Sequence, residues 1–272
     1  MSNVSISTNK LTIGYQSGRQ PSAVSRPVII QTDLTFSLNE GEMVCMLGPN
    51  GCGKSTLLRT LAGLQPALGG EFSLRQSSFS SQHSGVSPQK SIALVLTERL
   101  SMDNTTVHDV VAMGRYPYTS FLGGLTAGDE RVITESLEAV GFKQSAVSIL
   151  SPQGARLMQQ SAFNAHSDGE KQRILIAKAL AQQTPIILLD EPTAHLDLPH
   201  RILILRLLRR LAHEQGKTVL ISTHELDLAM ALSDRILLMT PGKGIQLDTA
   251  EALKKADAFT SAFGMDIFNA LG

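Results

Sequence analysis

The fold of this chain is decided by nine consecutive residues, Gly48-Pro49-Asn50-Gly51-Cys52-Gly53-Lys54-Ser55-Thr56. An apolar run at 43–47 precedes them and leucines at helical spacing follow, which is the strand–loop–helix context of a phosphate-binding loop. Glycine lets backbone N–H groups point at phosphate oxygens, and the N-terminus of the following helix adds the positive end of its dipole. The stretch therefore predicts a nucleoside triphosphate site. The alternative, a glycine-rich turn that happens to end in Lys-Ser, leaves the flanking strand and helix unexplained.

Each residue of this loop has an expected part in holding ATP. Lys54 is predicted to reach the β- and γ-phosphates, and the hydroxyl of Ser55 is predicted to bind Mg²⁺. Cys52 has two interpretations, an oxidation-sensitive thiol at a helix N-terminus or a filler at a position that the motif leaves open, and we favour the second. The predicted ATP-contacting residues of the loop are Gly48, Pro49, Asn50, Gly51, Cys52, Gly53, Lys54, Ser55 and Thr56.

Composition narrows the class of protein. The chain has 272 residues, 24 Lys and Arg against 24 Asp and Glu, and two cysteines. A formal charge of zero provides no broad basic field, so nucleic acid is not expected as a partner. Two cysteines indicate a reducing compartment without a disulfide framework. We see no signal peptide, and the longest apolar segment, 202–211, contains three arginines, so it is too short and too charged to span a bilayer.

Strands alternate with helices along the chain, which predicts a parallel sheet with the nucleotide at the carboxyl ends of its strands. Two capping boxes, Thr126 to Asp129 and Ser167 to Glu170, predict helix starts, and Gly141 and Gly216 predict helix ends. The Ser- and Gln-rich segment 75–91 is expected to form a hairpin or loop, and 97–165 is expected to be helical. Strands are predicted at 4–13, 28–38, 43–47, 92–96, 186–190, 218–222 and 235–240.

Two further motifs follow predicted strands. Asp190 and Glu191 end a run of four apolar residues, so Asp190 is predicted to join the Mg²⁺ shell and Glu191 to polarise the attacking water as general base. Acidic residues at the end of a strand are common and are weak evidence by themselves. Together with the phosphate loop earlier in the chain, they indicate a site that binds Mg²⁺ and hydrolyses ATP. His224 follows the strand at 218–222 and is predicted to contact the γ-phosphate and hold the water together with Glu191. A lone histidine is more often structural or surface-exposed.

With these motifs in order, the chain resembles the ATP-binding-cassette ATPases over about residues 3–250. The segment Ser167-Asp-Gly-Glu-Lys-Gln172 is similar to the signature motif that separates this family from other phosphate-loop proteins. The resemblance implies an α/β fold, with a P-loop NTPase (RecA-like) core, an N-terminal antiparallel β subdomain and an inserted α-helical subdomain at about 97–165. It implies one ATPase domain at 1–250, followed by a helical tail at 251–272.

The family likeness also implies roles for residues outside the phosphate loop. Tyr15 matches the aromatic residue that stacks on adenine, and Asp197 lies in the stretch that matches the dimer loop. The resemblance implies a head-to-tail homodimer in which each signature motif touches the ATP held by the opposite phosphate loop. Ser167 fits this role, because it caps a helix whose N-terminus can aim N–H groups and a hydroxyl at a γ-phosphate. The implied ATP contacts of this motif are Ser167, Gly169 and Glu170.

Two departures from the family pattern stand out. The family usually has Leu-Ser-Gly-Gly where this chain has His166-Ser167-Asp168-Gly169, so the charge of Asp168 would sit near a phosphate. The position usually held by a Mg²⁺-sensing Gln is Glu98, which can coordinate Mg²⁺ through an oxygen but cannot donate an amide hydrogen bond. We expect Glu98→Gln to retain ATPase activity.

The segment 106–118 resembles the importers of ferric siderophores, haem or cobalamin. In those proteins this helical region receives a helix of an integral-membrane permease, and a substrate-binding protein acts upstream. Aromatic residues around a Gly and a Pro suit such a docking surface, although ordinary packing of the helical lobe is the alternative. The chain would then lie peripherally on the cytoplasmic face of the inner membrane. The predicted docking residues are Arg115, Tyr116, Tyr118 and Phe121.

Two other functions remain open at this stage. A cassette ATPase without a transporter, acting in cluster assembly or DNA maintenance, would carry the same motifs, although the neutral charge disfavours the nucleic-acid versions. A non-catalytic scaffold gated by ATP draws support only from Asp168 and Glu98. The transported substrate is expected to be chosen by the permease and the binding protein.

Overall fold

The computed structural model describes residues 3–15, 27–74, 77–80, 91–96, 103–119, 124–142 and 161–264. The chain divides into two compact units. The first comprises residues 1–94, 185–191 and 208–272, and the second comprises 95–184 and 192–207. The second unit is longer than the expected helical insertion at 97–165, because it also takes in α5 (Asp168–Ala181) and the first part of α6 (Leu198–Gln215).

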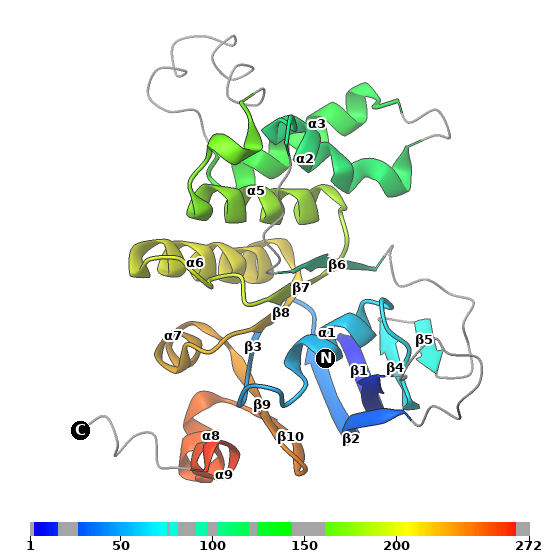
Figure 1. Cartoon of the computed structure of the whole chain (residues 1–272), viewed down its shortest axis with the longest axis vertical. Coiled ribbons are helices and arrows are strands. Elements are labelled where there is room, and N and C mark those ends of the chain that lie inside the picture. The colour runs from blue at the N-terminus through cyan, green and yellow to red at the C-terminus, as the bar shows by residue number, and fades with distance from the viewer. Residues whose placement is uncertain are drawn as a thin grey trace. The chain divides into compact units, whose positions relative to one another are not determined.

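A six-stranded sheet forms the centre of the first unit, with the strand order β10-β9-β3-β8-β7-β6 (Figure 1). Strands β9, β3, β8 and β7 run parallel to one another, and β10 pairs with β9 in the antiparallel sense. Every residue of β3, β7 and β8 is buried, as their nearly continuous apolar sequences require of central parallel strands. The bounds are β3 Met43–Leu47, β6 Ile92–Val95, β7 Ile186–Asp190, β8 Thr218–Ser222, β9 Arg235–Thr240 and β10 Gly244–Asp248.

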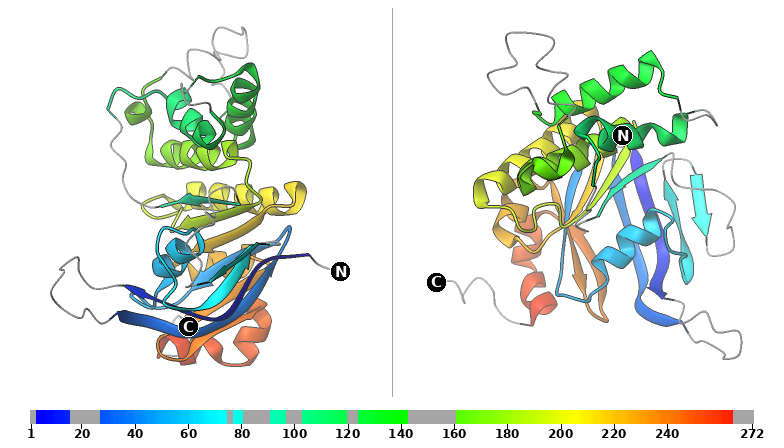
Figure 2. Two further views of the ribbon diagram at one scale, coloured as in Figure 1. Left: turned by 90° about the vertical axis from the view of Figure 1, so that its right-hand side faces the viewer. Right: turned by 45° about the horizontal axis from the view of Figure 1, so that its top comes forward.

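A four-stranded antiparallel sheet with the order β2-β1-β4-β5 completes the strands of this unit. The long strands β1 (Val4–Tyr15) and β2 (Val28–Asn39) lie side by side, as Figure 2 shows, and Ser7 pairs with Ser37. Strand β4 (Gly69–Leu74) pairs with β5 (Ser77–Ser80) in the antiparallel sense, so a strand lies near the start of the 75–91 segment, most of which is outside the described residues. The sequence did not predict β4, because its two leading glycines obscure the strand pattern.

Apart from the second part of α6, the helices of the first unit are short. They are α1 Lys54–Leu61, α7 Leu226–Leu232, α8 Ala250–Lys255 and α9 Ala258–Phe263. Helix α9 packs on β9, and Phe259 is fully buried, so this part of the C-terminal tail packs on the core. The chain after Gly264 lies outside the described residues.

The described part of the second unit is helical apart from its connections. It contains α2 Val107–Ala112, the 3-10 helix η2 Met113–Tyr118, α3 Ala127–Ala139, η3 Phe163–Ala165, α5 and the first part of α6. Both predicted capping boxes are present, since Thr126 pairs with Asp129 and Ser167 with Glu170 in the reciprocal pattern. Gly141, with φ +70°, follows the end of α3 as predicted.

Candidate active site

The phosphate loop connects β3 to α1 with a backbone that requires glycine at two points. Gly48 has φ +156°, and a Cβ there would lie 2.5 Å from the carbonyl oxygen of Met239. Gly53 has φ +108°, and a Cβ there would lie 2.9 Å from the Cγ2 atom of Ile30. Other residues would be strained by these φ values and blocked by these neighbours, so the loop holds this shape only with glycine.

Lys54 folds back across this loop. Its Nζ atom donates to the carbonyl oxygens of Gly48 at 2.8 Å and Pro49 at 3.2 Å, and the side chain is buried. Helix α1 begins at Lys54 without a side-chain cap and without an acidic residue in its first turn. Its N-terminal N–H groups and the ammonium group therefore provide positive charge for an anion at one place.

A buried polar residue that the sequence analysis missed, Gln31, braces the phosphate loop. Its Nε2 atom donates to the carbonyl oxygens of Cys52 at 3.2 Å and of Thr240 at 3.1 Å, which ties the loop to the end of β9. The available signal was an amide directly after three β-branched apolar residues at the start of β2. A buried amide of this kind is retained where it has hydrogen-bond partners.

Tyr15, predicted to stack on adenine, lies at the end of β1 with 46% of its surface exposed. Its hydroxyl lies 2.8 Å from the Oγ1 atom of Thr56 in the first turn of α1. The structure therefore places the predicted adenine residue beside the last residue of the predicted phosphate loop. An exposed aromatic ring held at one end is suited to stacking on a base.

The acidic pair of β7 lies at the same sheet edge as the phosphate loop. Strand β8 separates β3 from β7, and Ser222 at the end of β8 pairs in register with both Met46 and Asp190. The hydroxyl of Ser222 donates to Oδ1 of Asp190 at 2.6 Å, and its oxygen accepts from the backbone N–H of Glu191 at 2.9 Å. Ser222 was not among the predicted site residues, although a polar residue at the end of a predicted buried strand was a signal for it.

Glu191 and His224 meet as the sequence predicts. Nε2 of His224 and Oε1 of Glu191 form an ion pair when the imidazole is protonated. Glu191 has φ +47°, an uncommon backbone conformation for a residue other than glycine, asparagine or aspartate. The adjacent hydrogen bonds from its N–H to the hydroxyl and carbonyl oxygens of Ser222 hold it there. Strained residues of this type cluster at functional sites.

The thiol of Cys52 is buried against the loop. Burial raises its pKa, and the nearby charge of Lys54 and two backbone hydrogen bonds offset this only in part. The reactive form of cysteine is the thiolate, so a raised pKa disfavours the oxidation-sensitive interpretation and supports the filler interpretation.

In the second unit, the signature segment begins α5. Oε2 of Glu170 accepts from the N–H of Ser167 at 3.0 Å and from its hydroxyl at 2.8 Å. A Cβ on Gly169 would lie 2.8 Å from the ring of His200, which also contacts the carboxylate of Asp197. His200 therefore brings the predicted dimer-loop residue Asp197 close to the predicted signature residue Gly169.

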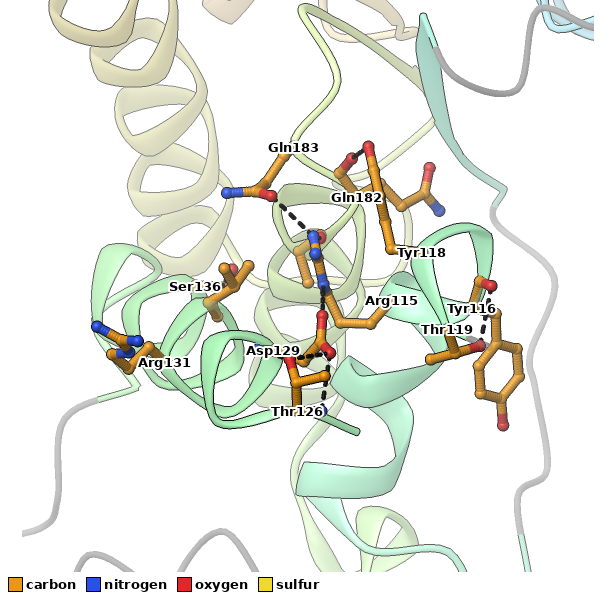
Figure 3. A network of polar contacts seen from close by, with 12 residues as sticks. Arg115, Tyr116, Tyr118, Thr119, Thr126, Asp129, Arg131, Ser136, Gln182 and Gln183 are labelled. Carbon is orange, nitrogen blue, oxygen red and sulfur yellow. Dashed lines mark hydrogen bonds and ion pairs between the residues drawn. The ribbon is translucent and has the colours of Figure 1, made fainter. Parts of the chain in front are cut away.

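Arg115, predicted to lie on a permease-docking surface, is instead buried, with 7% of its surface exposed. Its guanidinium donates to Oδ1 of Asp129, the carbonyl oxygen of Ala181 and Oε1 of Gln183, each at 2.8 Å (Figure 3). The prediction needs correction, because these partners hold the side chain inside the unit. Arg115 joins η2 to α3 and to the C-terminal end of α5, where a cation is favoured by the helix dipole.

The two tyrosines beside Arg115 remain at the surface. Tyr116 is 64% exposed and Tyr118 is 45% exposed. The ring of Tyr118 covers the guanidinium of Arg115 at 4.2 Å, and its hydroxyl donates to the carbonyl oxygen of Gln182 at 2.7 Å (Figure 3). The docking role of both residues stays a prediction.

Two predicted site residues, the metal ligand Glu98 and the docking residue Phe121, lie outside the described residues. Across the ranges that the structure describes, no cluster of three His, Cys, Asp or Glu side chains is arranged to hold a metal. Within those same ranges, no helix has the length and apolar character needed to cross a membrane.

Comparison with known proteins agrees with this geometry. A family model described as ABC transporter matches residues 31–194. An uncharacterised ABC transporter ATP-binding protein of Methanocaldococcus jannaschii is 34% identical over 96% of this chain and 81% of its own length. The iron(3+)-hydroxamate import ATP-binding protein of Bacillus subtilis is also 34% identical, over 96% of this chain and 88% of its own. A solved inward-facing structure of a presumed metal-chelate type ABC transporter is similar with a TM-score of 0.75 and 28% identity, covering 96% of this chain and 89% of that one.

Proposed function

We propose that this chain, which belongs to the ABC transporter family and is an ATPase, powers a membrane permease that imports an iron–siderophore, haem or cobalamin complex. The observation that carries the proposal is the similarity to the hydroxamate-import relative, which extends over nearly the whole of both chains. The likeness to a structure of the metal-chelate transporter type points to the same class of cargo. All three proposed cargoes are metal chelates.

ATP binding in this proposal starts from the loop between β3 and α1. The N–H groups at the start of α1 and the ammonium of Lys54 receive the phosphates, so Lys54 exchanges its hydrogen bonds with Gly48 and Pro49 for bonds to phosphate oxygens. Tyr15 stacks on the adenine while its hydroxyl keeps contact with Thr56.

The residues present also fit Mg²⁺. The hydroxyl of Ser55 and the carboxylate of Asp190 are oxygen ligands of the kind that Mg²⁺ prefers, and a site completed by phosphates and water needs no cage made of protein alone. When bound, the ion neutralises charge on the β- and γ-phosphates. Ser222 orients the Asp190 carboxylate for this role through the 2.6 Å hydrogen bond.

Hydrolysis is assigned to the pair at the ends of β7 and β8. Glu191 accepts a proton from the attacking water as general base, and His224 orients Glu191 and contacts the γ-phosphate. Ser222 holds the backbone of Glu191, because its hydroxyl oxygen accepts a hydrogen bond from the Glu191 N–H. This arrangement provides base, orienting group and backbone support from two adjacent strands.

The remaining proposed contacts are intermolecular. Two copies of the chain form a homodimer in which Ser167, Gly169 and Glu170 of one copy approach the ATP of the other, with Asp197 at the interface. Tyr116 and Tyr118 face the permease at the cytoplasmic side of the inner membrane, where the chain is peripheral. A substrate-binding protein delivers the cargo to the permease.

Two measurements on the full chain test this function. Glu191→Gln removes the base, so we expect the variant to lose ATP hydrolysis by at least about 100-fold and to accumulate as an ATP-bound dimer in size-exclusion chromatography with light scattering. Affinity purification from detergent-solubilised membranes is expected to recover a polytopic permease with the chain.

The control is Lys54→Ala, which should prevent nucleotide binding and therefore dimerisation. A Glu191→Gln variant that stays monomeric with ATP contradicts the dimer assignment. Normal hydrolysis in that variant contradicts the assignment of the base. Recovery of the chain without any membrane protein contradicts the transport assignment and favours a cassette that acts alone.

A further inference from the structure

The N-terminal end of α5 carries an unusual concentration of negative charge for a place that is to meet a phosphate. Asp168 and Glu170 both lie in the first turn. Burial raises the pKa of the Glu170 carboxyl, but hydrogen bonds from Ser167 and the nearby charges of His166 and Arg173 outweigh this and lower it overall. Glu170 is therefore anionic at neutral pH, and each carboxylate opposes the approach of another anion.

His166 lies directly behind this turn, at the position where the family usually has leucine. Its side chain is only 10% exposed. Nε2 of the ring lies 2.7 Å from the hydroxyl oxygen of Ser161, and the ring meets that of Phe142 edge-on at 5.3 Å. These two contacts hold the other ring nitrogen, Nδ1, at 3.6 Å from Oε2 of Glu170.

That carboxylate oxygen is the same atom that fixes the signature serine. Oε2 of Glu170 accepts from the N–H and from the hydroxyl of Ser167, so the proton of this hydroxyl is held within the chain. An imidazolium next to Oε2 draws negative charge away from the hydroxyl and weakens its hold on that proton. Ser167 is then better able to donate to a phosphate.

We propose that His166 is a positioning residue that offsets the carboxylate of Glu170 in the first turn of α5, so that protonation of His166 favours closure of the dimer on ATP. This inference rests on the proposed function, because it assigns Ser167 to the ATP of the partner copy. A histidine side chain attracts a carboxylate only in its protonated form, so this contribution is larger at lower pH than at higher pH.

Among the described residues, the other charged groups around His166 do not reverse the expected effect, which is that protonation of His166 favours closure of the dimer. Glu170 is in contact, and Arg173 lies one turn further along α5, where it donates to the carbonyl oxygen of Gly141 at 3.4 Å. Lys171 reaches Asp168 at 4.0 Å, which offsets that carboxylate only weakly at an exposed site. The elements before and beside the ring contribute the neutral side chains of Ser161 and Phe142.

The test uses the full chain with Glu191→Gln as the parent, and measures the ATP concentration at half-maximal dimer formation at pH 6 and pH 8 in the presence of Mg²⁺. The parent is compared with His166→Leu, the residue usual in the family, and with His166→Gln, which keeps a hydrogen-bonding group but no charge. ATP also gains and loses a proton in this pH range. Its contribution to the pH dependence of the midpoint is the same in every variant, so it cancels when the variants are compared.

We expect the ratio of the two midpoints, pH 8 over pH 6, to be about threefold larger in the parent than in either His166 variant, the size expected of one partly exposed charge pair. The matched control is His108→Gln, which breaks another His–Glu pair of the same unit, His108 with Glu130 at 2.8 Å. It should keep the ratio of the parent.

Equal ratios in the parent and both His166 variants would overturn the inference while leaving the proposed function intact. The same loss of pH dependence in His108→Gln would also overturn it, because the effect would then not belong to the signature segment. A parent that does not dimerise at any pH would overturn the proposed function and this inference together.

Discussion

Ser222 and Asp190 lie opposite each other in adjacent parallel strands, and the hydroxyl of Ser222 donates to Oδ1 of Asp190 at 2.6 Å. The same hydroxyl oxygen accepts from the N–H of Glu191. One buried serine therefore positions both acidic residues proposed for Mg²⁺ binding and for catalysis.

We predict that Ser222→Ala lowers the kcat of ATP hydrolysis by about tenfold, because one hydrogen bond of about 1 kcal/mol to each acidic residue is lost. The KM for ATP should change less, since the phosphate loop is untouched. Steady-state ATPase kinetics measure both values.

The control for this variant is Ser233→Ala. Ser233 donates to the carbonyl oxygen of Ala229 at 2.5 Å and precedes Asp234, whose N–H bonds to Met43 at the start of β3, away from the phosphate loop. The Ser233→Ala substitution removes a hydrogen bond comparable to that of Ser222 and should leave kcat unchanged. An equal loss of kcat in both variants would show that Ser222 acts only through stability.

His224→Gln is predicted to lower kcat by about 10- to 100-fold while ATP still binds, because the ion pair that orients Glu191 is lost. Kinetics combined with nucleotide-binding titration separate the two effects. His213→Gln serves as the control, since His213 pairs with Asp234 at 2.9 Å in the same unit. Loss of ATP binding in His224→Gln would argue against a role confined to hydrolysis.

Arg115→Met is predicted to lower the Tm by about 5 °C or more, because it leaves the buried carboxylate of Asp129 without its cationic partner and removes the hydrogen bond from η2 to the carbonyl oxygen of Ala181. Tyr116→Ala changes an exposed residue and should alter the Tm by no more than about 1 °C. Differential scanning calorimetry measures both. A Tm for Arg115→Met equal to that of the unmodified chain would contradict the structural role.

Tyr116→Ala also separates docking from stability. We expect transport by the reconstituted permease complex to fall severalfold although the Tm is retained, because a large exposed aromatic anchor is lost from the proposed interface. Unchanged transport would remove Tyr116 from the docking surface. Arg115 variants are unsuited to this measurement, since their effect on folding would be read as a loss of coupling.

Acid should weaken the second unit through Asp129. Hydrogen bonds from the side chain and the backbone of Thr126, followed by the bond from Arg115, lower the pKa of Asp129 from 3.8 to about 2. A lowered pKa stabilises the folded state above the unfolded-state value, and this contribution is lost as the pH falls from about 4 to about 2.

We therefore predict that Asp129→Asn is less stable than the unmodified chain at pH 6 and that the difference shrinks toward pH 2. Denaturant unfolding followed by circular dichroism between pH 2 and pH 6 gives this comparison. Glu135→Gln, which removes an exposed carboxyl from the same helix, is the control. A difference that stays constant with pH would contradict the assigned pKa.

The amino-acid sequence by itself determined the glycine-rich loop, the acidic pair at the end of β7, the histidine after β8 and the two capping boxes. Each of these depends on neighbours close along the chain: glycines where the backbone needs positive φ, a hydroxyl three residues before a carboxylate, or polar residues directly after an apolar run. The α/β class followed for the same reason, because alternating strands and helices leave few ways to build a sheet.

The tertiary structure alone decided which distant residues meet. Gln31 braces the phosphate loop across a separation of 209 residues from Thr240, and Ser222 reaches Asp190 only because β8 and β7 are neighbours in register. For Arg115, the local sequence led to a wrong prediction. Its aromatic neighbours suggested a surface, but its partners, Asp129, Ala181 and Gln183, lie on α3 and just beyond α5 and bury it. Burial and pairing arise from packing between elements, which local sequence patterns do not encode.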